Sequence, residues 1–326
     1  MKRIGTSVFS AILISTLASC APVDGEVDEA LDTVDEVASN PLNLAFVTLR
    51  PDQRRCISPL CGGYWVRRVN RTTMRCVDGT YAAECYVGRV DWTGLNLDER
   101  ALADFQTLAA QGRAILRGRI DPMADPMWSQ IGELVAVGGW QPVTPNAVTG
   151  QIWDIGDNGV RCVTAPCLSL DAMRVNVVSS ATTASTLDLS GVRGLSARDA
   201  TRLRAAVGDA TQTVLFAGTV TTVGRGRVMR ATQAWTQVSQ PITEATFCTA
   251  DAQCTPTVLT RDVASVAECY CPFCPSAVVT TATAAARDRA FRRYCSTFRE
   301  SCPVPRCAAP PAVGCVNHAC AFAPLR

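Results

Sequence analysis

A seven-residue motif with two cysteines occurs twice in the chain and constrains the fold more than any other feature of the sequence. The first copy, Arg55–Cys61, reads RCISPLC, and the second, Arg161–Cys167, reads RCVTAPC. The tripeptide RVN follows both motifs at the same offset, first as Arg68–Asn70 and then as Arg174–Asn176. Because several segments agree in identity and in spacing, the chain contains two copies of one fold.

Two further matches set the extent of the copies. Gly94–Leu95 recurs as Gly194–Leu195, and Trp140 recurs as Trp235, both at offsets smaller than that of the cysteine motifs. Two insertions in the first copy account for the difference. We therefore place the copies at residues 44–145 and 150–240.

In both copies, segments with the hydrophobic periodicity of strands and segments with that of helices follow one another in the same order. In the first copy this periodicity predicts strands at 45–49, 64–69 and 85–90, a helix at 97–111, and strands at 113–120 and 134–143. Asn96 precedes Glu99 by three positions and Ser196 precedes Asp199 likewise, so each pair predicts a helix N-cap with its acidic partner. The order β-β-β-α-β-β is that of the oligonucleotide/oligosaccharide-binding (OB) barrel.

The predicted fold class is therefore mainly β, with two tandem OB-like β-barrel modules followed by a small disulfide-rich α+β module. In such modules Trp140 and Trp235 could stack on a ligand. Aromatic residues near the end of a last strand are more often core residues, so that alternative is favoured for both tryptophans.

Sixteen of the 17 cysteines fall into two separate blocks, which predicts two disulfide frameworks formed outside the cytoplasm. The first block contains Cys56, Cys61, Cys76, Cys85, Cys162 and Cys167. The second contains Cys248, Cys254, Cys269, Cys271, Cys274, Cys295, Cys302, Cys307, Cys315 and Cys320. We expect all of them to be disulfide-bonded, with the two cysteines of each repeated motif closing a loop between the first two strands; the pairing of the second block stays open.

The second block defines the last module, at residues 245–326. A helix is predicted at about 283–298 and a closing hairpin at Cys315–Cys320. Cys271 and Cys274 form a CxxC motif, which metal and redox sites also use. Since neither a second matching pair nor a thioredoxin-like frame is evident, we predict no metal and no cofactor.

The first residues have the pattern of a secretory signal. A basic head at Lys2 and Arg3 precedes a short apolar run, and residues 17–20 read LASC, which resembles a bacterial lipobox. We therefore expect residues 1–19 to be a lipoprotein signal peptide and Cys20 to carry acyl chains that anchor the protein in a lipid bilayer. Ala21 stands where an aspartate would favour inner-membrane retention, so the expected location is the outer membrane; a soluble secreted protein is the alternative.

Residues 20–43 then contain the lipidated cysteine and an acidic tether. This segment has no basic residue and contains Asp24, Glu26, Asp28, Glu29, Asp32, Asp35 and Glu36. Charges of one sign repel one another and extend a chain, so the segment is expected to hold the body away from the membrane.

Together these motifs resemble a group of uncharacterised putative lipoproteins from myxobacteria and related delta-proteobacteria. The resemblance lies in the strand end Leu49–Asp52, LRPD, which precedes the paired cysteines and Gly62–Tyr64, and in the cysteine cluster of the last module. It implies a location and an architecture, and it brings no established activity, substrate or catalytic residue.

Several classes of enzyme lack their required residues in this chain. His318 is the only histidine and lies within the predicted closing hairpin, and Lys2, in the signal, is the only lysine. Schiff-base enzymes and lysine-bearing phosphate loops are therefore excluded. A hydrolase with a histidine base would have to use His318, for which a structural role in the hairpin is favoured, and no nucleophile-elbow sequence is present. Paired-carboxylate chemistry remains open, with the candidates Asp91, Asp98 and Glu99. Nucleic acid is not an expected partner, because no basic run interleaved with aromatics appears.

These observations favour a non-enzymatic envelope lipoprotein that binds an unknown envelope protein or glycan through the loops of its OB-like modules. One alternative is a surface-displayed protease inhibitor, in which the cysteine-flanked segment 302–307 would present Arg306 to a trypsin-like enzyme. A second alternative is a carboxylate-based glycan hydrolase.

Overall fold

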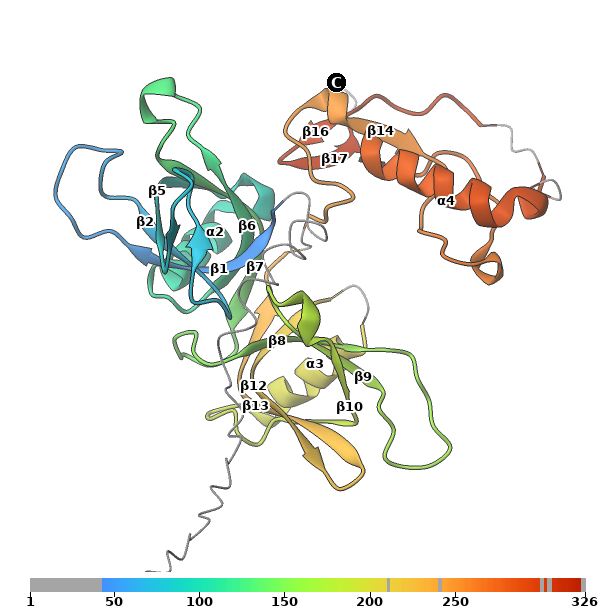
Figure 1. Cartoon of the computed structure of the whole chain (residues 1–326), viewed down its shortest axis with the longest axis horizontal. Coiled ribbons are helices and arrows are strands. Elements are labelled where there is room, and N and C mark those ends of the chain that lie inside the picture. Colours follow the sequence, from blue (N-terminus) through green and yellow to red (C-terminus); the bar gives the residue numbers. More distant parts are fainter. Residues whose placement is uncertain (1–42, 210–211, 240–241, 300–301, 304–306, 324–326) are drawn as a thin grey trace, which may run out of the picture.

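A computed structural model describes residues 43–209, 212–239, 242–299, 302–303 and 307–323. The protein is mainly β. Figure 1 shows two strand-rich units, coloured blue to green and green to yellow, and a third part built around one long helix. Among the helices of the described residues, none is long and apolar enough to cross a lipid bilayer.

In the first copy, five strands and one helix form the frame. They are β1 (Ala45–Pro51), β2 (Tyr64–Arg68), β5 (Cys85–Asp91), α2 (Glu99–Ala110), β6 (Ile115–Pro122) and β7 (Gly132–Pro142). The strand pairs are β1–β2, β2–β5, β5–β7, β7–β6 and β6–β1, so the hydrogen bonding returns to the strand where it began. All pairs are antiparallel except β5–β7. The small hairpin of β3 (Met74–Arg75) and β4 (Tyr81–Ala82) and the short turns η1 (Thr93–Leu95) and η2 (Pro126–Trp128) lie between these elements.

The second copy repeats this order of pairing. Its elements are β8 (Ile152–Asp157), β9 (Leu170–Arg174), η3 (Val178–Ser180), β10 (Thr182–Ala184), β11 (Thr186–Asp188), α3 (Ala197–Val207), β12 (Val214–Val223) and β13 (Gly226–Gln237). β8 pairs with β9 and β12, and β12 pairs with β13. The third strand is divided at Ser185: β10 pairs antiparallel with β9, and β11 pairs parallel with β13.

Side chains alternate between the two faces of the strands, as a half-buried sheet requires. In β1, Val47 and Leu49 are buried whereas Arg50 is exposed. The inward side chains pack with Phe105 and Ala109 of α2, which covers the interior of the first copy. Each such aliphatic or aromatic side chain contributes about 1.5–3 kcal/mol by leaving water. The strands and α2 lie within two residues of their predicted positions in the first copy, because this alternation is readable in the sequence.

The N-cap prediction is wrong for the first helix. Asp98, not Asn96, caps α2, because its Oδ1 accepts the backbone N–H of Ala101 at 2.8 Å. Asn96 ends η1 instead, with a φ of +50° that asparagine tolerates better than most residues. In the second helix the predicted cap is present: Ser196 Oγ accepts the N–H of Asp199 at 3.1 Å.

The predicted match of Gly94 with Gly194 is also displaced by three residues. A Cβ on Gly94 would lie 2.4 Å from Ala136 O, and a Cβ on Gly191 would lie 2.6 Å from Ala231 O. Both glycines allow the same close approach of the chain to the last strand of their copy. Gly191 is therefore the counterpart of Gly94, whereas Gly194 has a φ of +78° and open space around it.

The two copies join through the ends of their last strands. β7 and β13 pair antiparallel, with Trp140 opposite Gln237 and Trp235 opposite Pro142. Each tryptophan thus faces the residue two positions after the other tryptophan, which is the signature of a local two-fold relationship. One hydrophobic cluster spans the junction and contains Val69, Ile115, Trp140, Ile152, Val175, Leu215, Ala217 and Trp235.

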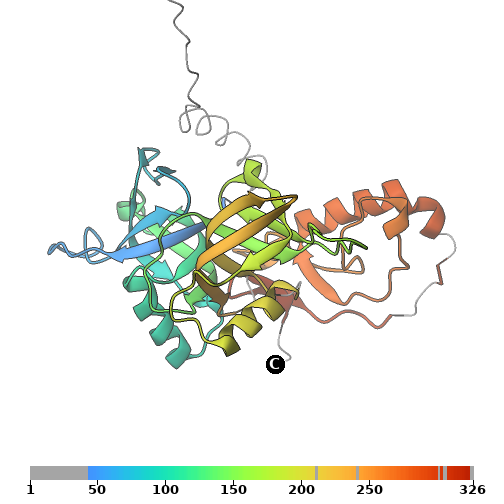
Figure 2. The ribbon, with the colours of Figure 1, turned by 90° about the horizontal axis from the view of Figure 1, so that it is seen from below.

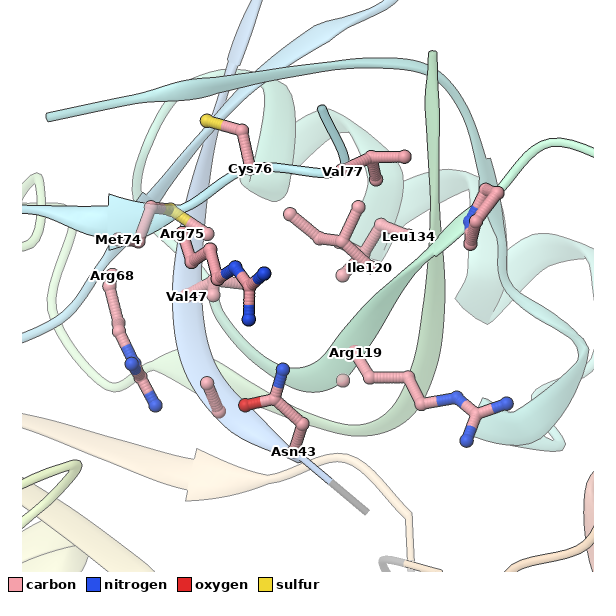
Figure 3. A pocket seen from close by; sticks show the side chains of 13 residues that line it. Asn43, Val47, Arg68, Met74, Arg75, Cys76, Val77, Arg119, Ile120 and Leu134 are labelled. Carbon is pink, nitrogen blue, oxygen red and sulfur yellow. The ribbon is translucent and has the colours of Figure 1, made fainter. Parts of the chain in front are cut away.

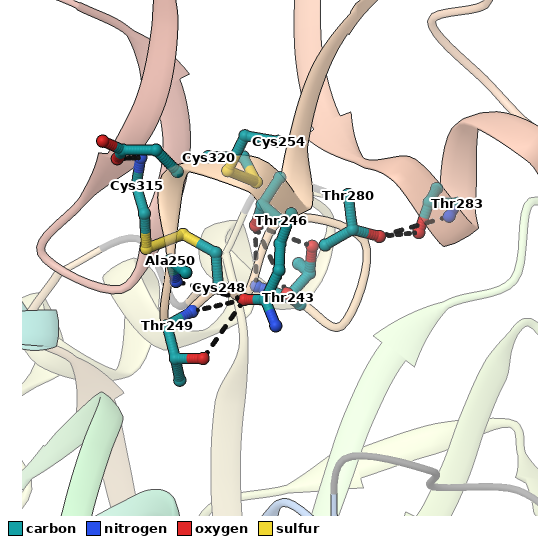
Figure 4. Close-up of a disulfide and its surroundings, with 12 residues drawn as sticks. Thr243, Thr246, Cys248, Thr249, Ala250, Cys254, Thr280, Thr283, Cys315 and Cys320 are labelled. Carbon is teal, nitrogen blue, oxygen red and sulfur yellow. Dashed lines mark hydrogen bonds between the residues drawn. A yellow bond between two sulfur atoms is a disulfide. The ribbon is translucent and has the colours of Figure 1, made fainter.

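The last module consists of two antiparallel strand pairs and one helix. Its elements are η4 (Asp251–Gln253), β14 (Cys254–Thr257), η5 (Val266–Glu268), β15 (Ala277–Thr280), α4 (Thr281–Arg299), β16 (Val313–Val316) and β17 (Ala319–Phe322). Its five disulfides are Cys248–Cys315, Cys254–Cys320, Cys269–Cys295, Cys271–Cys302 and Cys274–Cys307. The first two fasten the closing hairpin, β16–β17, to the chain around η4 and β14 (Figure 4). Cys315 and Cys320 stand opposite each other in this hairpin, and each is bonded elsewhere.

The last module lies against the first copy (Figures 1 and 2). Ile242 and Phe247 pack on Val135 and Val137 of β7. The backbone N–H of Ile242 also donates to Val137 O at 2.8 Å. At the tip of the closing hairpin, His318 Nε2 lies 2.7 Å from Asp91 Oδ2.

Candidate functional site

The outer face of the first copy carries a row of aromatic and arginine side chains across three strands. The register places Arg50 of β1 opposite Trp65 of β2, and Trp65 opposite Tyr86 of β5. The rings of Trp65 and Tyr86 meet edge to face, with 5.5 Å between their centroids. The guanidinium carbon of Arg54 lies 5.1 Å from the Trp65 centroid and 5.0 Å from that of Tyr86, and that of Arg50 lies 5.7 Å from Trp65. These four residues are called the aromatic–arginine row below.

Arg54 is held in place by a carboxylate beneath it. Arg54 Nε donates to Asp52 Oδ1 at 3.0 Å and to Oδ2 at 2.9 Å. The Asp52 side chain is only 1% exposed, and the hydrogen bond from Arg54 lowers the pKa of this carboxyl to about 2. Asp52 therefore remains charged at any ordinary pH, and the position of Arg54 is fixed before a ligand arrives.

The loop between β1 and β2 is also fixed beside the row. The Cys56–Cys61 disulfide closes it. The Tyr86 hydroxyl donates to Pro59 O at 2.8 Å and accepts the backbone N–H of Gly63 at 3.2 Å. The row and its neighbouring loop thus form one preorganised surface, which lowers the entropy cost of binding.

The second copy has different chemistry at the equivalent positions. There Gly156, Asp171 and Thr183 replace Arg50, Trp65 and Tyr86 in the same register. Asp154, beside them, is partly buried, and the loss of solvation raises the pKa of its carboxyl to about 6. The fold does not require aromatic residues at these positions, since the second copy folds without them. The row is therefore a specialisation of the first copy.

The tryptophans considered as ligand platforms lie inside the molecule. Trp140 is 1% exposed and Trp235 is fully buried. Trp140 Nε1 donates to Thr213 O at 3.0 Å, and Trp235 Nε1 donates to Arg113 O at 2.8 Å. Neither indole offers a face to a ligand, which fits the alternative interpretation of both as core residues.

The remaining candidates are not gathered into one site among the described residues. Asp98 caps α2, and Asp91 accepts hydrogen bonds from Thr93 and contacts His318. Cys20 and Arg306 lie outside the described residues. The same holds for all of residues 1–42.

Every cysteine of the described residues is bonded to another cysteine. The first block forms Cys56–Cys61, Cys76–Cys85 and Cys162–Cys167. The sulfurs of Cys248, Cys254 and Cys320 lie close enough together to suggest a metal site, but all three belong to disulfides. Cys271 and Cys274 of the CxxC motif are bonded to Cys302 and Cys307. A thiolate ligand set is therefore not present in this part of the chain.

The aromatic–arginine row was not among the residues that the sequence analysis singled out. Its members are scattered along the chain, and only the register of three strands brings them together. One signal was available: within the predicted strands 64–69 and 85–90, Trp65 and Tyr86 fall on the outward side of the alternation. Aromatic side chains that gather on an outer face often mark an interaction surface.

The fold and the row define a class of protein: two copies of one β-rich unit, one of them with a specialised outer face, followed by a disulfide-rich module. Residues 45–241 match the model of a family described as a domain of unknown function, DUF6748, and the chain belongs to this family. The match covers both copies together, as expected if the joined pair is the unit of folding. No curated protein and no solved structure matches the chain.

Proposed function

We propose that this protein is a non-enzymatic lipoprotein of the outer cell envelope that binds an extracellular glycan through the aromatic–arginine row. The envelope location is supported by the lipobox-like sequence before Cys20. It is also supported by the eight disulfides, since such bonds persist in oxidising compartments outside the cytoplasm.

Each copy is proposed to be an OB-like barrel. The support is the order of pairing, in which the first strand pairs with the second and fourth, and the third pairs parallel with the fifth. OB barrels bind oligosaccharides and oligonucleotides on the face of strands two and three and on the loop between strands one and two. Trp65 of β2, Tyr86 of β5 and the disulfide-closed loop occupy those positions.

The single observation that carries the proposal is the row itself. Aromatic rings pack against the apolar faces of sugar rings, while the guanidinium groups of Arg50 and Arg54 can donate to hydroxyl, carboxylate or phosphate oxygens. The same side chains could stack on nucleotide bases. The envelope location favours a glycan.

Electrophoresis of the mature protein through native gels that contain a polysaccharide tests this proposal. Neutral and acidic envelope polysaccharides are expected to slow the protein, and Trp65→Ala should abolish most of the effect. Asp171→Ala, at the equivalent position of the second copy, is the matched control and should keep it. Equal mobility of wild type and Trp65→Ala in every polysaccharide, or retardation by single-stranded oligonucleotides alone, would overturn the assignment of a glycan ligand.

Membrane anchoring is tested separately. Wild-type protein is expected in the membrane fraction with a lipid mass on the peptide that begins at Cys20, and Cys20→Ser should move the protein to the soluble fraction. A soluble wild-type protein without lipid would contradict the lipoprotein assignment and leave the glycan assignment standing.

A further inference from the structure

Two disulfides of the last module lie side by side (Figure 4). Cys248 is bonded to Cys315, and Cys254 is bonded to Cys320. The sulfurs of Cys248, Cys254 and Cys320 all lie within 4.8 Å of one another. Cys315 and Cys320 also stand directly opposite each other in the β16–β17 hairpin. These four residues are called the four-cysteine cluster below, and each of them has more than one cysteine within reach.

A second pairing of the same cysteines fits the backbone. The turn of the hairpin has two residues, so the residue pair that flanks it is hydrogen-bonded and the next pair, Cys315 and Cys320, is not. The Cα atoms of such a pair are about 4.5 Å apart, within the range of about 4.4–6.8 Å that a disulfide spans. The sulfurs of Cys248 and Cys254 are already neighbours. The cluster can therefore also form Cys248–Cys254 together with Cys315–Cys320.

Solvent reaches the cluster at Cys315. This cysteine is half-buried, whereas Cys248, Cys254 and Cys320 are buried. A thiolate from solution therefore meets the sulfur of Cys315 first, and its attack there makes Cys248 the leaving thiolate. Because Cys248 is buried beside the second disulfide, the nearest sulfurs that it can attack next are those of Cys254 and Cys320.

We propose that the four-cysteine cluster is a thiol–disulfide exchange site, which an external thiol opens at Cys315. The external thiolate forms a mixed disulfide with Cys315 and releases the Cys248 thiolate. The Cys248 thiolate attacks Cys254, forms Cys248–Cys254 and releases the Cys320 thiolate. The Cys320 thiolate attacks Cys315 in the mixed disulfide, forms Cys315–Cys320 and releases the external thiolate. Two disulfides are present before and after, so there is no net oxidation or reduction and the thiol acts as a catalyst.

The second pairing removes both covalent links between the hairpin β16–β17 and the chain around η4 and β14. Hydrogen bonds remain, with Cys248 N–H donating to His318 O at 3.0 Å and Cys320 N–H donating to Thr246 O at 2.8 Å. Hydrogen bonds open in local fluctuations, so the hairpin separates more often once its cross-links are gone. His318 lies at its tip and contacts Asp91, so the pairing of the cluster controls how the last module docks on the first copy. The inference is independent of the glycan ligand, since the cluster and the aromatic–arginine row share no residue.

Variants with one thiol in the cluster test the exchange in the mature chain, in which Cys20→Ser removes the N-terminal thiol. Cys315→Ser leaves the thiol on Cys248. After incubation at pH 8 the protein is quenched in acid, unfolded and labelled with a maleimide, and peptide mass spectrometry identifies the labelled cysteine. The label is expected to shift from Cys248 to Cys254 and Cys320, because the Cys248 thiolate exchanges with their disulfide. In Cys248→Ser, the thiol left on Cys315 should attack Cys320 and shift the label to Cys254.

The Cys76–Cys85 disulfide of the first copy is the matched control. Cys76 lines a cavity of about 260 Å³ that opens at one end of this copy, so a dissolved thiol can approach it as well (Figure 3). No third cysteine sulfur of the described residues lies within 4.8 Å of both of its sulfurs. Cys85→Ala leaves the thiol on Cys76, and the label should stay there.

The chain with all four cysteines of the cluster completes the test. In a buffer of reduced and oxidised glutathione, peptides joined by Cys248–Cys254 and by Cys315–Cys320 are expected, and backbone amides around His318 should exchange faster in that isomer. The proposal is overturned if the label stays on Cys248 in Cys315→Ser and on Cys315 in Cys248→Ser. It is equally overturned if glutathione leaves the cluster unchanged, or reduces it without forming the second pairing.

Discussion

Asn70 and Asn176 make the same hydrogen bonds in opposite directions across the junction of the two copies. Asn70 Nδ2 donates to Ile152 O at 2.7 Å and Asn70 Oδ1 accepts from Ile152 N at 2.8 Å. Asn176 makes both contacts with Phe46, each at 2.8 Å. Both asparagines have a positive φ, of 60° and 63°, and the amide side chain offers a donor and an acceptor together. The repeated RVN motif thus marks the contact that joins the copies.

Replacing either asparagine by alanine should destabilise both copies together. Asn70→Ala leaves backbone groups of the other copy without their partners and strains a left-handed residue, so we expect a loss of about 3 kcal/mol in the free energy of unfolding. Urea unfolding followed by tryptophan fluorescence measures it, because Trp140 and Trp235 lie in the junction. Asn146→Ala, at an exposed position, is the control and should change stability by less than about 0.5 kcal/mol. A loss confined to one copy would show that the copies fold independently.

The contact between Asp91 and His318 should make the docking of the last module depend on pH. Burial alone would raise the pKa of Asp91, but hydrogen bonds from Thr93 and His318 outweigh it and the pKa is lowered. A carboxyl with a lowered pKa in the folded state contributes stability above its unfolded pKa and loses it as the pH falls through the folded pKa. The contact is therefore expected to weaken below about pH 4.

Asp91→Asn should reduce the loss of stability between pH 6 and pH 3, as measured by urea unfolding at each pH. The control is Asp188→Asn. Asp188 accepts hydrogen bonds from Ser190 as Asp91 does from Thr93, and its pKa is also lowered, but it has no histidine partner. Exchange of backbone amides around Phe247 and His318 should speed up only in the Asp91 variant. Equal changes in both variants would assign the effect to the local turn and not to the docking.

Asp52 should control ligand binding without touching the ligand. Its carboxylate fixes Arg54 over Trp65 and Tyr86, so Asp52→Asn is expected to weaken polysaccharide retardation several-fold by loosening that arginine. Because the pKa of Asp52 is about 2, retardation of the wild type should stay constant from pH 4 to pH 8. A steep decrease near pH 4 would mean that another carboxyl governs binding.

The regular elements of the first copy could be predicted from the sequence because their periodicity is local. Strands such as Ala45–Pro51 alternate buried and exposed residues, and a helix such as Glu99–Ala110 carries an apolar stripe. Predictions that depend on backbone geometry were wrong. The cap of the first helix is Asp98 and not Asn96, and the repeat partner of Gly94 is Gly191 and not Gly194. Loops of unequal length shift the alignment of the two copies, and the composition does not show where the shift occurs.

The candidate site could not be predicted in the same way. Arg50, Arg54, Trp65 and Tyr86 meet only through strand register, and a one-residue slip would place Trp65 in the core. The sequence contains no basic run, yet the fold gathers two arginines and two aromatic rings on one face. For the same reason the pairing within the second cysteine block was left open, since contacts between distant cysteines depend on the tertiary fold.

Disulfides of different span should contribute unequally to stability. Cys254–Cys320 closes a separation of 66 residues, whereas Cys56–Cys61 closes one of 5. Alone, the long loop would contribute about 4 kcal/mol in the chain-entropy model, but Cys248–Cys315 closes nearly the same loop, so removing Cys254–Cys320 is expected to cost about 3 kcal/mol, against about 2 kcal/mol for the short loop. Serine replacement of both cysteines in each pair, followed by urea unfolding, measures the two losses. Removing Cys254–Cys320 should loosen β17 from β14 and expose it to proteolysis, while Cys248–Cys315 still holds β16 to the chain before η4. Removing Cys56–Cys61 should leave the fold intact but weaken polysaccharide binding, because the loop beside the row becomes free. Unchanged binding would show that this loop takes no part in binding the polysaccharide.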